Sequence, residues 1–505
     1  MWLSAPDIDW WWISFFAWVP LLWACERQTP RYAFLLGLAA GVSAVSVGFY
    51  WLAGLLTRFA GMGSFSAYLV VLVFSLYQGL QWATMAGAAT WLRQRSGLGL
   101  CILAPLTWTA VEVILPNPFP VYIAMLWSWH PLWIQTAEIG GAAMVGFIMV
   151  AINGALFDVS HTYFRHRALD RRAAAIGLCC LVGVPLYGSI RIASVDAELT
   201  SAPTSNIGIV QGNFGIRTRR KQPARVLAEL QRVSAELERE GAELVVWGET
   251  AYPFRGLTRG RGRDFSPSDP RRLRRGFTVP LITGAITREP KGGDPFPWNS
   301  AIVLDRDNRF GDRYDKNYPL LFGEYVPLVD PNWYLKLVPN ASYLNPGDGP
   351  GVLRVAGYRF GPLICYEDLL VDFARDTVGQ GVHALLNLTN DSWFGRTREQ
   401  GEHLALASLR AVENRRPLLR AVNAGISAYI DPVGRIVIKT NVSDSDQDGY
   451  EGAEGFVAAV PMMNPDSRSF FGSTGHLFAA LVWFALFMVS WRAWKKPPNA
   501  VPHAP

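Results

Sequence analysis

The sequence predicts a polytopic α-helical membrane domain joined to an extracytoplasmic α/β domain of layered strands and helices. Half of the 505 residues are hydrophobic and only 17% are charged, which is unusual for a water-soluble protein. Long apolar runs fill much of residues 1–192 and return near the C-terminus. Between them, short apolar runs alternate with amphipathic helix patterns, as is typical of a layered α/β domain.

Seven apolar segments are expected to cross the membrane, since each approaches or exceeds the roughly 20 residues that span a hydrocarbon core. Such runs can also form core helices of a soluble protein. That alternative is disfavoured because six of them precede residue 192, with few charged residues, such as Arg58 and Glu112, near their interiors or ends. The segments are residues 8–25, 32–56, 66–92, 97–115, 137–158, 173–191 and 469–491.

The basic connecting segments predict the orientation, because Lys and Arg favour the cytoplasmic side of a membrane. Residues 192–468 are therefore expected on the opposite side. Met1 is expected there too, unless a further helix precedes the sequence given. We expect a transmembrane helical domain over residues 1–192, an α/β domain over 200–460 and a last transmembrane helix over 469–491. The basic segments are residues 26–31, 93–95, 161–172 and 492–496.

Residues 116–136 are rich in proline and aromatic residues and too interrupted for a straight span. Trp127, Trp129 and Trp133 suit the membrane interface, where an indole ring finds both apolar and polar surroundings. Two interpretations stay open: a re-entrant or surface segment near a lipid entry point, and a simple anchoring belt.

The α/β domain is predicted from alternating strand and helix patterns. Residues 223–240 form an amphipathic helix, and 403–416 also have helical periodicity. Several strands follow one another directly, which favours a layered domain over a doubly wound one. The predicted strands are residues 206–211, 243–247, 281–286, 300–304, 361–365, 383–388 and 426–430.

Residues 255–275 carry eight arginines among Gly, Ser, Pro and Asp, a loop composition. A solvated loop is the simpler interpretation. The alternative is an outward-facing patch that attracts anionic lipid headgroups.

Composition also limits cofactors and partners. The net charge of +6 requires no nucleic acid, because basic membrane-flanking loops supply such an excess. Five cysteines without regular spacing predict neither a disulfide framework nor a zinc site. No CxxC, HExxH or phosphate-binding glycine loop occurs, so we expect no metal or other cofactor.

Three reactive residues stand where predicted strands end. Cys365 ends an apolar run and is the only cysteine outside the apolar segments; Glu249 follows LVVWG, and Lys316 follows residues 310–315. A buried structural cysteine is the alternative for Cys365.

A thiol is only slightly ionised near pH 7, so a nucleophilic cysteine needs a base or a positive neighbour. His383 lies within a predicted strand and His403 begins a predicted helix, and neither stands in an obvious partner motif. A glutamate base with a lysine partner is therefore favoured over a Cys–His pair.

Glu249, Lys316 and Cys365 occur in the order and approximate spacing of the Glu–Lys–Cys triad of the nitrilase, or carbon–nitrogen hydrolase, superfamily. With the predicted membrane helices, the chain resembles its membrane-embedded branch, the apolipoprotein N-acyltransferases, over nearly its whole length. The motifs that carry the resemblance are VQGN at 210–213, WGET at 247–250, FGEYVP at 322–327, ICYE at 364–367, NDSWFG at 390–395 and ENRRPLLRAVNAGISA at 413–428.

The resemblance implies an αββα sandwich and assigns roles to the triad. Cys365 is implied as nucleophile, Glu249 as general base and Lys316 as the group that stabilises the tetrahedral oxyanion. Glu324 matches the family's second active-site glutamate, and two supporting residues beside the nucleophile match Tyr366 and Glu367. The Tyr366 backbone N–H is a further candidate oxyanion donor by position. Ordinary turn or helix-start carboxylates are the alternative for the two supporting glutamates.

The resemblance also implies a reaction and its partners. An acyl chain would pass from a phospholipid, by analogy phosphatidylethanolamine, through a thioester to the α-amine of an S-diacylglyceryl-cysteine at an apolipoprotein N-terminus. The implied location is the bacterial inner membrane, with the α/β domain on the periplasmic side.

The chain departs from the family pattern near these motifs. Gly248 precedes the base where proline is common, Arg217–Lys221 lack a tryptophan common after the VQG strand, and Ala424 stands where threonine is common. Tyr318 and Leu320–Leu321 replace a His and a Val-Pro. No departure removes a triad member; together they bear on substrate fit.

Two other functions compete with acyl transfer. A membrane-anchored amidase of the same superfamily would use water in the second step, and the triad alone does not separate the two. A non-enzymatic transporter or scaffold would carry polar residues deep inside its spans, and the spans contain few.

Overall fold

A computed structural model describes residues 2–59, 61–117, 119–254, 256–321, 323–337, 342–442 and 449–495. Arg255 of the arginine-rich segment and Phe322 of FGEYVP lie outside these ranges. The chain divides into two compact units. One comprises Met1–Ala53, Gly63–Ser194 and Ser469–Pro505, and the other comprises Gly54–Met62 and Val195–Arg468.

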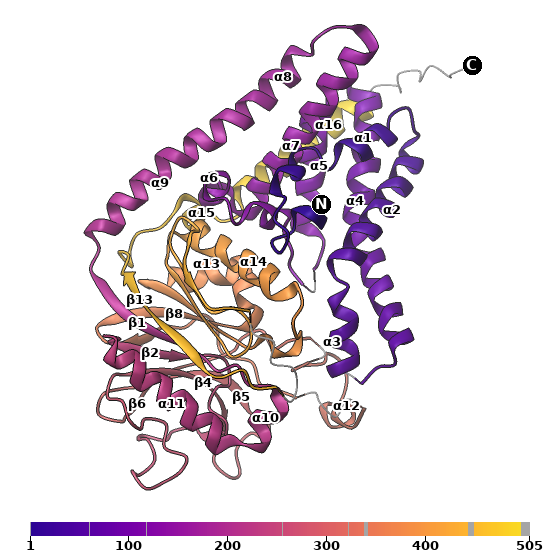
Figure 1. Cartoon of the computed structure of the whole chain (residues 1–505). Helices are drawn as coiled ribbons and strands as arrows, with labels where there is room; N and C mark the ends of the chain where they lie inside the picture. Colours follow the sequence, from indigo (N-terminus) through magenta and orange to yellow (C-terminus); the bar gives the residue numbers. More distant parts are fainter. Residues whose placement is uncertain are drawn as a thin grey trace. The chain divides into compact units, whose positions relative to one another are not determined.

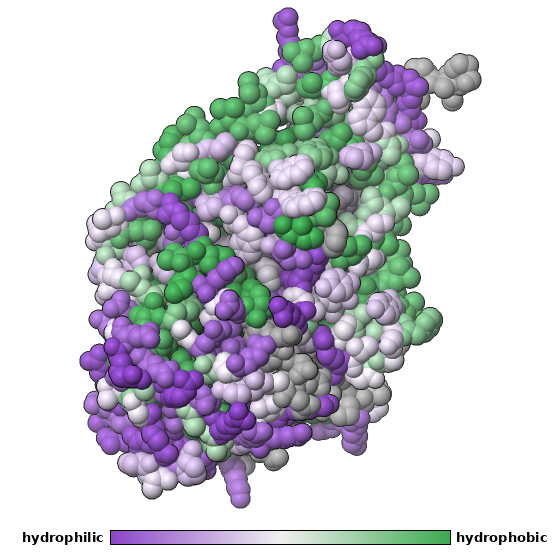
Figure 2. Space-filling model, in the orientation of Figure 1, coloured by the Kyte–Doolittle hydropathy of each residue, from purple (hydrophilic) through white to green (hydrophobic). Residues whose placement is uncertain are grey.

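The first unit is helical, and the predicted apolar segments all fall on helices (Figure 1). Among the described residues, five helical segments are long and apolar enough to cross a membrane. Figure 2 shows hydrophobic residues over the outer faces of several of these helices, as expected where lipid replaces water. The five are α2 (Pro30–Gly48), α4 (Ser64–Ser96), α7 (Ala137–His166), the continuous α8–η4–α9 segment (Arg171–Ser201) and α16 (Leu477–Trp494).

The other two predicted spans are shorter than expected. The segment Trp11–Ala24, which contains η2 (Trp11–Phe15) and α1 (Val19–Ala24), and the 15-residue α5 (Leu100–Ile114) fall short of the membrane-spanning length. At 1.5 Å per residue, α5 is only about 22 Å long. The predicted span 32–56 is also interrupted, because α2 ends at Gly48 and α3 (Trp51–Phe59) begins after a turn.

The segment 116–136 contains two short helices, η3 (Ile123–Trp127) and α6 (Pro131–Ile134). Trp127 is fully buried and donates its indole N–H to Ser14 Oγ at 2.7 Å. The anchoring-belt interpretation is therefore wrong for Trp127, whose ring packs inside the helical unit.

The second unit is an α/β sandwich, so the predicted layered fold is confirmed. Its first sheet has the order β13-β1-β2-β4-β5-β6, with β3 beside β4. Strands β1, β2 and β4 are parallel, and β5 reverses the direction before β6 restores it. The strands are β1 (Thr204–Gln211), β2 (Leu244–Trp247), β3 (Leu257–Thr258), β4 (Leu281–Arg288), β5 (Trp298–Leu304), β6 (Phe310–Asp315) and β13 (Glu454–Pro461).

The second sheet has the order β12-β11-β10-β9-β8-β7, in which β8, β9 and β10 are parallel. Helix α11 (Pro223–Arg239) covers the first sheet; α13 (Val371–Gly379) and α14 (Glu399–Asn414) cover the second, and β10 packs against β1 and β2 (Figure 1). The layers are therefore αββα. The strands are β7 (Leu353–Val355), β8 (Tyr358–Ile364), β9 (Ala384–Thr389), β10 (Leu418–Val422), β11 (Ala428–Ile430) and β12 (Ile436–Lys439).

The predicted amphipathic helix is confirmed by α11. The four apolar residues of its predicted face are 1–3% exposed and belong to one core cluster with Trp247 of β2. At roughly 25 cal/mol per Å² of apolar surface removed from water, this face contributes several kcal/mol. The four are Val226, Leu230, Val233 and Leu237.

The arginine-rich segment is more ordered than a solvated loop. The guanidinium of Arg259 lies 3.9 Å from the Trp298 ring centroid and pairs with Asp315 at 3.0 Å. Arg274 is buried and donates to the carbonyls of Thr278 and Asp305 at 2.8 and 2.7 Å. These two arginines stabilise the segment against its own domain.

Candidate active site

Strand direction brings the three predicted catalytic residues to one edge of the sandwich. Glu249 follows β2, Lys316 follows β6 and Cys365 follows β8, and each of these strands ends at the same edge of its sheet. The Glu249 backbone N–H donates to Thr389 O of β9 at 3.4 Å, which joins the edges of the two sheets. The site therefore forms where the two sheets meet.

Glu249 is buried and held by specific contacts. Its Oε1 accepts a hydrogen bond from Asn299 Nδ2 at 2.7 Å and lies 3.5 Å from Lys316 Nζ. Gly284 of β4 permits the close backbone approach, because a Cβ there would lie 2.7 Å from Glu249 Cα. Burial raises the pKa of Glu249, while the Lys316 charge opposes that rise.

Lys316 is the cation of the site. Its Nζ donates to Glu324 Oε2 at 2.7 Å, and the same oxygen accepts the Leu320 backbone N–H at 2.9 Å. Burial alone would lower the pKa of Lys316, but the negative charge that a Cys365 thiolate would carry, with the carboxylates of Glu324 and Glu249, raises it well above its ordinary value. The ammonium therefore stays charged.

Cys365 occupies a strained backbone conformation at the tip of β8. Its φ is 57°, in the left-handed region that residues with a Cβ rarely adopt, at a cost on the order of 1–3 kcal/mol. The 3-10 turn η5 (Cys365–Leu369) begins there and leads into α13. The turn leaves the thiol half-buried at the end of the strand.

The charges around Cys365 favour a neutral thiol at rest. Burial raises the pKa of the Cys365 thiol well above its ordinary value, Lys316 lowers it, and Glu249 and Glu324 raise it further. A thiolate here would need a base to take the proton, and Glu249 is a carboxylate close to Lys316 that could accept it.

Glu367 connects the Cys365 turn to the segment that follows Lys316. Its Oε2 accepts from Ile364 N and the Tyr314 hydroxyl, both at 2.7 Å. Its Oε1 accepts from the backbone N–H groups of Asn317 and Tyr318 at 2.7 and 3.1 Å. Burial raises the pKa of this carboxyl to about 7. The carboxylate thus connects the Cys365 and Lys316 loops.

Tyr366 and Glu324 both lie close to the Lys316 ammonium. The Lys316 ammonium lies 5.8 Å from the Tyr366 ring centroid, and the Tyr366 hydroxyl is 3.5 Å from Pro319 O. The six predicted site residues therefore lie in one region of the structure, around Lys316 and the Cys365 turn. They are Glu249, Lys316, Glu324, Cys365, Tyr366 and Glu367.

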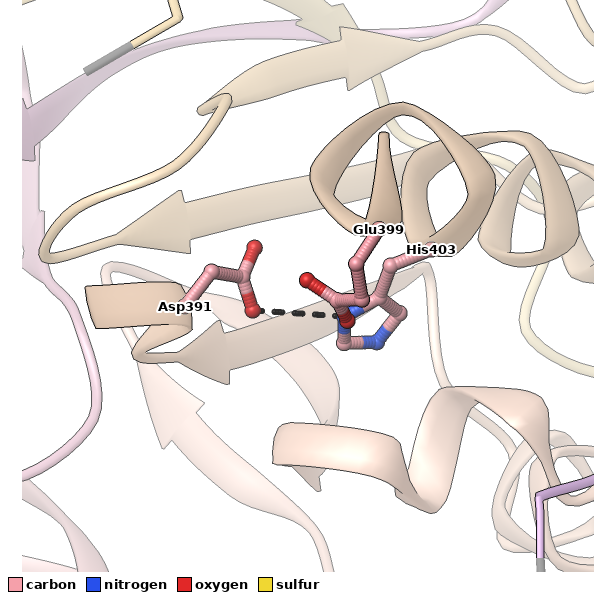
Figure 3. Close-up of side chains that lie close together, drawn as sticks. All are labelled: Asp391, Glu399 and His403. Carbon is pink, nitrogen blue, oxygen red and sulfur yellow. Dashed lines mark hydrogen bonds and ion pairs between the residues drawn. The ribbon is translucent and has the colours of Figure 1, made fainter. Parts of the chain in front are cut away.

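A buried charge network contacts the turn that follows Cys365, and it was not predicted. His403 of α14 approaches Asp368 Oδ1 with Nε2 at 2.9 Å and Asp391 Oδ1 with Nδ1 at 3.3 Å. Arg420 of β10 donates to the other oxygens of Asp368 and Asp391, at 2.7 and 3.1 Å. Figure 3 shows His403 and Glu399 projecting from one helix towards Asp391.

The carboxylates and imidazole of Asp391, Glu399 and His403 could in principle ligate a metal, since their ligand atoms lie within 4.8 Å of one another. The surroundings favour a charge network instead. Both His403 nitrogens already face carboxylates, and the Arg420 guanidinium occupies the second oxygen of Asp391. A divalent cation there would face a fixed positive charge.

His403 is unsuited to act as a base. Burial and Arg420 lower its pKa, but Asp368 and Asp391 outweigh them and raise it to about 10. His383 lies just before β9, where its Nδ1 accepts the Arg359 backbone N–H at 3.0 Å.

Arg219 of α10 (Ile216–Lys221) is a further cation close to Glu249. Its Nη1 donates to Thr250 O and Oγ1 at 2.9 and 2.6 Å, and its charge acts on the neighbouring Glu249. Within the described part of the chain, its Nε and Nη2 have no hydrogen-bond partner. The residue lies in the basic Arg217–Lys221 segment that departs from the family pattern.

Comparisons with known proteins cover both units. The family model "Apolipoprotein N-acyltransferase N-terminal domain" matches residues 1–155, and the model "Carbon-nitrogen hydrolase" matches residues 206–446. A Geobacter metallireducens protein named "Apolipoprotein N-acyltransferase" is 30% identical over 443 residues, covering 84% of this chain and 81% of the relative. A protein of the same name from Allorhizobium ampelinum is 28% identical, and the match covers 95% of this chain and 86% of the relative.

Solved structures also match the α/β unit. An amidase from Nesterenkonia is 17% identical with a TM-score of 0.36, covering 52% of this chain and 93% of that one. A nitrilase-superfamily protein of Saccharomyces cerevisiae is 18% identical with a TM-score of 0.38, covering 54% and 95%.

Proposed function

This chain belongs to the apolipoprotein N-acyltransferase family, and we propose that it moves a fatty acyl chain from a phospholipid to the N-terminal amine of S-diacylglyceryl apolipoproteins. Glu249, Lys316 and Cys365 form its catalytic triad, with Glu324, Tyr366 and Glu367 in supporting roles. Residues 200–460 form the catalytic domain. The observation that carries the proposal is the convergence of a half-buried thiol, a carboxylate and a charged lysine at one sandwich edge.

The first step acylates the enzyme. Glu249 takes the proton of the Cys365 thiol, and the thiolate attacks the carbonyl carbon of the phospholipid ester. Lys316 and the Tyr366 backbone N–H stabilise the oxyanion of the tetrahedral intermediate. The C–O bond then breaks, Glu249 returns the proton to the leaving oxygen, and a lysophospholipid departs from a thioester acyl-enzyme.

The second step transfers the acyl chain to the acceptor. The free α-amine attacks the thioester carbonyl, and Glu249 takes a proton from the nitrogen. The C–S bond breaks, an amide forms, and the proton returns to the Cys365 sulfur. Atoms and charge balance without a cofactor.

Arg219 supports a donor that carries an anionic phosphodiester, as phospholipids do. A guanidinium can donate two parallel hydrogen bonds to phosphate oxygens, and the Nε and Nη2 groups of Arg219 can supply them. A phosphodiester held beside Glu249 would place its glycerol esters near the nucleophile. Phosphatidylethanolamine is the donor we propose.

The membrane helices provide the reason for a lipid substrate. The chain is a multi-pass membrane protein, and both proposed substrates keep their acyl chains in the bilayer. The basic links at 26–31, 93–95 and 161–172 support an inner-membrane orientation with the catalytic domain on the periplasmic side.

The proposed function is tested by incubating detergent-purified protein with phosphatidylethanolamine and a diacylated lipopeptide, beside Cys365→Ala. We expect N-acyl lipopeptide and lysophospholipid in equal amounts from the wild type and neither from the variant. Release of free fatty acid with the lipopeptide unchanged would instead indicate the amidase-like hydrolase.

A further inference from the structure

The strained backbone at Cys365 is held by an asparagine on the neighbouring strand. Asn387 of β9 donates its Nδ2–H to Cys365 O at 2.9 Å and lies 3.4 Å from Leu363 O. A residue with a Cβ keeps a left-handed conformation only when its surroundings favour it over the alternatives. The orientation of the Asn387 amide is therefore important, because a flipped amide would point oxygen at oxygen.

Arg420 determines that orientation. Its Nη1 lies 3.2 Å from Asn387 Oδ1, and a guanidinium has only donors. The amide oxygen must therefore face Arg420, which leaves the Asn387 N–H groups to face the carbonyl of Cys365. Asn387 and Arg420 are both fully buried, so water does not compete for these bonds.

The same arginine holds the other side of the turn. Asp368 lies three residues after Cys365. One of its carboxylate oxygens accepts a hydrogen bond from Arg420 at 2.7 Å, and the other lies 2.9 Å from His403 Nε2. Arg420 and His403 also share Asp391, which follows β9. Two cations thus face two carboxylates in a buried site, and the pairing compensates the cost of burying each charge.

We propose that Arg420, Asn387 and His403 are positioning residues that fix the Cys365 turn for attack. Arg420 acts through the Asn387 amide on the carbonyl of Cys365, and with His403 it anchors Asp368. None of the three is proposed to touch the substrate. The inference rests on the proposed acyl transfer, because the three residues are proposed to hold Cys365, the nucleophile of that reaction, in position.

The test uses two variants and a matched control. Asn387→Asp keeps the size of the side chain and an acceptor for Arg420, but replaces the N–H that donates to Cys365. Arg420→Lys keeps the positive charge but loses the two guanidinium nitrogens that donate to Asp368, Asn387 and Asp391 at once. Arg416→Lys is the control: Arg416 is also fully buried and lies four residues earlier, but it donates to Val382 O, Asn464 O and Ser467 O instead of this network.

Two readouts separate positioning from stability. The first is kcat and KM for transfer from phosphatidylethanolamine to lipopeptide. The second is the rate at which iodoacetamide alkylates Cys365, followed by mass spectrometry of its peptide, which requires no lipid. For Asn387→Asp and Arg420→Lys we expect kcat to fall on the order of 10²-fold with KM nearly unchanged, and the alkylation rate to change.

Arg416→Lys is expected to lower the melting temperature while leaving kcat of the folded protein and the alkylation rate unchanged. Equal effects of Arg420→Lys and Arg416→Lys on all readouts, or an unchanged kcat in Asn387→Asp, would overturn the inference. A wild type that transfers no acyl chain would overturn the proposed function instead, and the alkylation comparison would still test the positioning.

Discussion

The Lys316 ammonium lies 2.7 Å from Glu324 Oε2 and 3.5 Å from Glu249 Oε1. The shorter contact is the stronger pairing, so Glu324 takes much of the lysine's attraction. Burial raises the pKa of Glu249, Lys316 lowers it, and the nearby charge of Glu324 raises it further, which suits a group that must accept a proton.

Replacing Glu324 by glutamine tests whether Glu324 keeps the pKa of Glu249 raised. Lys316 would then be balanced by Glu249 alone, the Glu249 pKa would fall and its basicity would decrease. We expect the acylation rate to fall about tenfold to a hundredfold, measured by single-turnover release of lysophospholipid. Glu289→Gln is the control, because Glu289 pairs with Arg259 in the arginine-rich segment. An unchanged rate in Glu324→Gln would contradict the assignment.

Arg219→Gln tests the proposed contact with the donor phosphate. Loss of charge-assisted hydrogen bonds, about 1.5–3 kcal/mol, predicts a KM for phosphatidylethanolamine raised about tenfold to a hundredfold with little change in kcat. Arg220→Gln is a matched control, since Arg220 is exposed on the same short helix. Equal KM changes in the two variants would indicate general surface charge instead of a specific contact.

Cys365→Gly tests the backbone strain. Glycine adopts a φ of 57° without the steric cost of a Cβ, so this variant should be more stable than Cys365→Ala by about 1 kcal/mol. Thermal unfolding of the two inactive proteins measures the difference. As a control, Ala374→Gly within helix α13 should destabilise the protein by about 1 kcal/mol, because glycine there has no strained conformation to relieve and is a poorer helix former than alanine. A Cys365→Gly variant less stable than Cys365→Ala would refute the strain.

His403 gives the stability a defined pH dependence. Its pKa is raised from 6.5 in the unfolded chain to about 10 in the folded protein, because Asp368 and Asp391 hold the imidazolium. The folded state therefore binds the proton more tightly, and the stabilisation is fully present below pH 6.5 and lost as pH rises through about 10. The stability difference between wild type and His403→Gln should shrink over that window. A difference independent of pH would contradict a charged His403.

The three triad residues predicted from the sequence share one signal, a reactive side chain at the end of an expected strand. In the structure Glu249, Lys316 and Cys365 follow β2, β6 and β8, and strands of like direction end at one edge of a sheet. The predicted strands and helix α11 are confirmed because each buries one set of side chains, and the spacing of those apolar residues can be seen within the segment itself.

The charge network lacked such a signal. Arg420 interrupts the apolar pattern of β10, and this strand was not predicted at all; its partners Asp368, Asn387 and His403 come from three other elements. A polar residue inside a buried strand, as in ALLNLT, was the only hint. Pairing across distant elements depends on the packing of both sheets, which periodicity does not encode. Strand β13 was also missed, although its burial alternates along the strand.

The central claim is that Cys365 carries the acyl chain, and the most direct test is the intact mass of the protein after incubation with phosphatidylethanolamine alone. The wild type should gain the mass of one acyl chain, the adduct should be removed by hydroxylamine, and Cys365→Ala should gain nothing. Adding a diacylated lipopeptide should discharge the adduct into N-acyl product. An adduct that persists in Cys365→Ala, or none in the wild type with any phospholipid, would contradict the account.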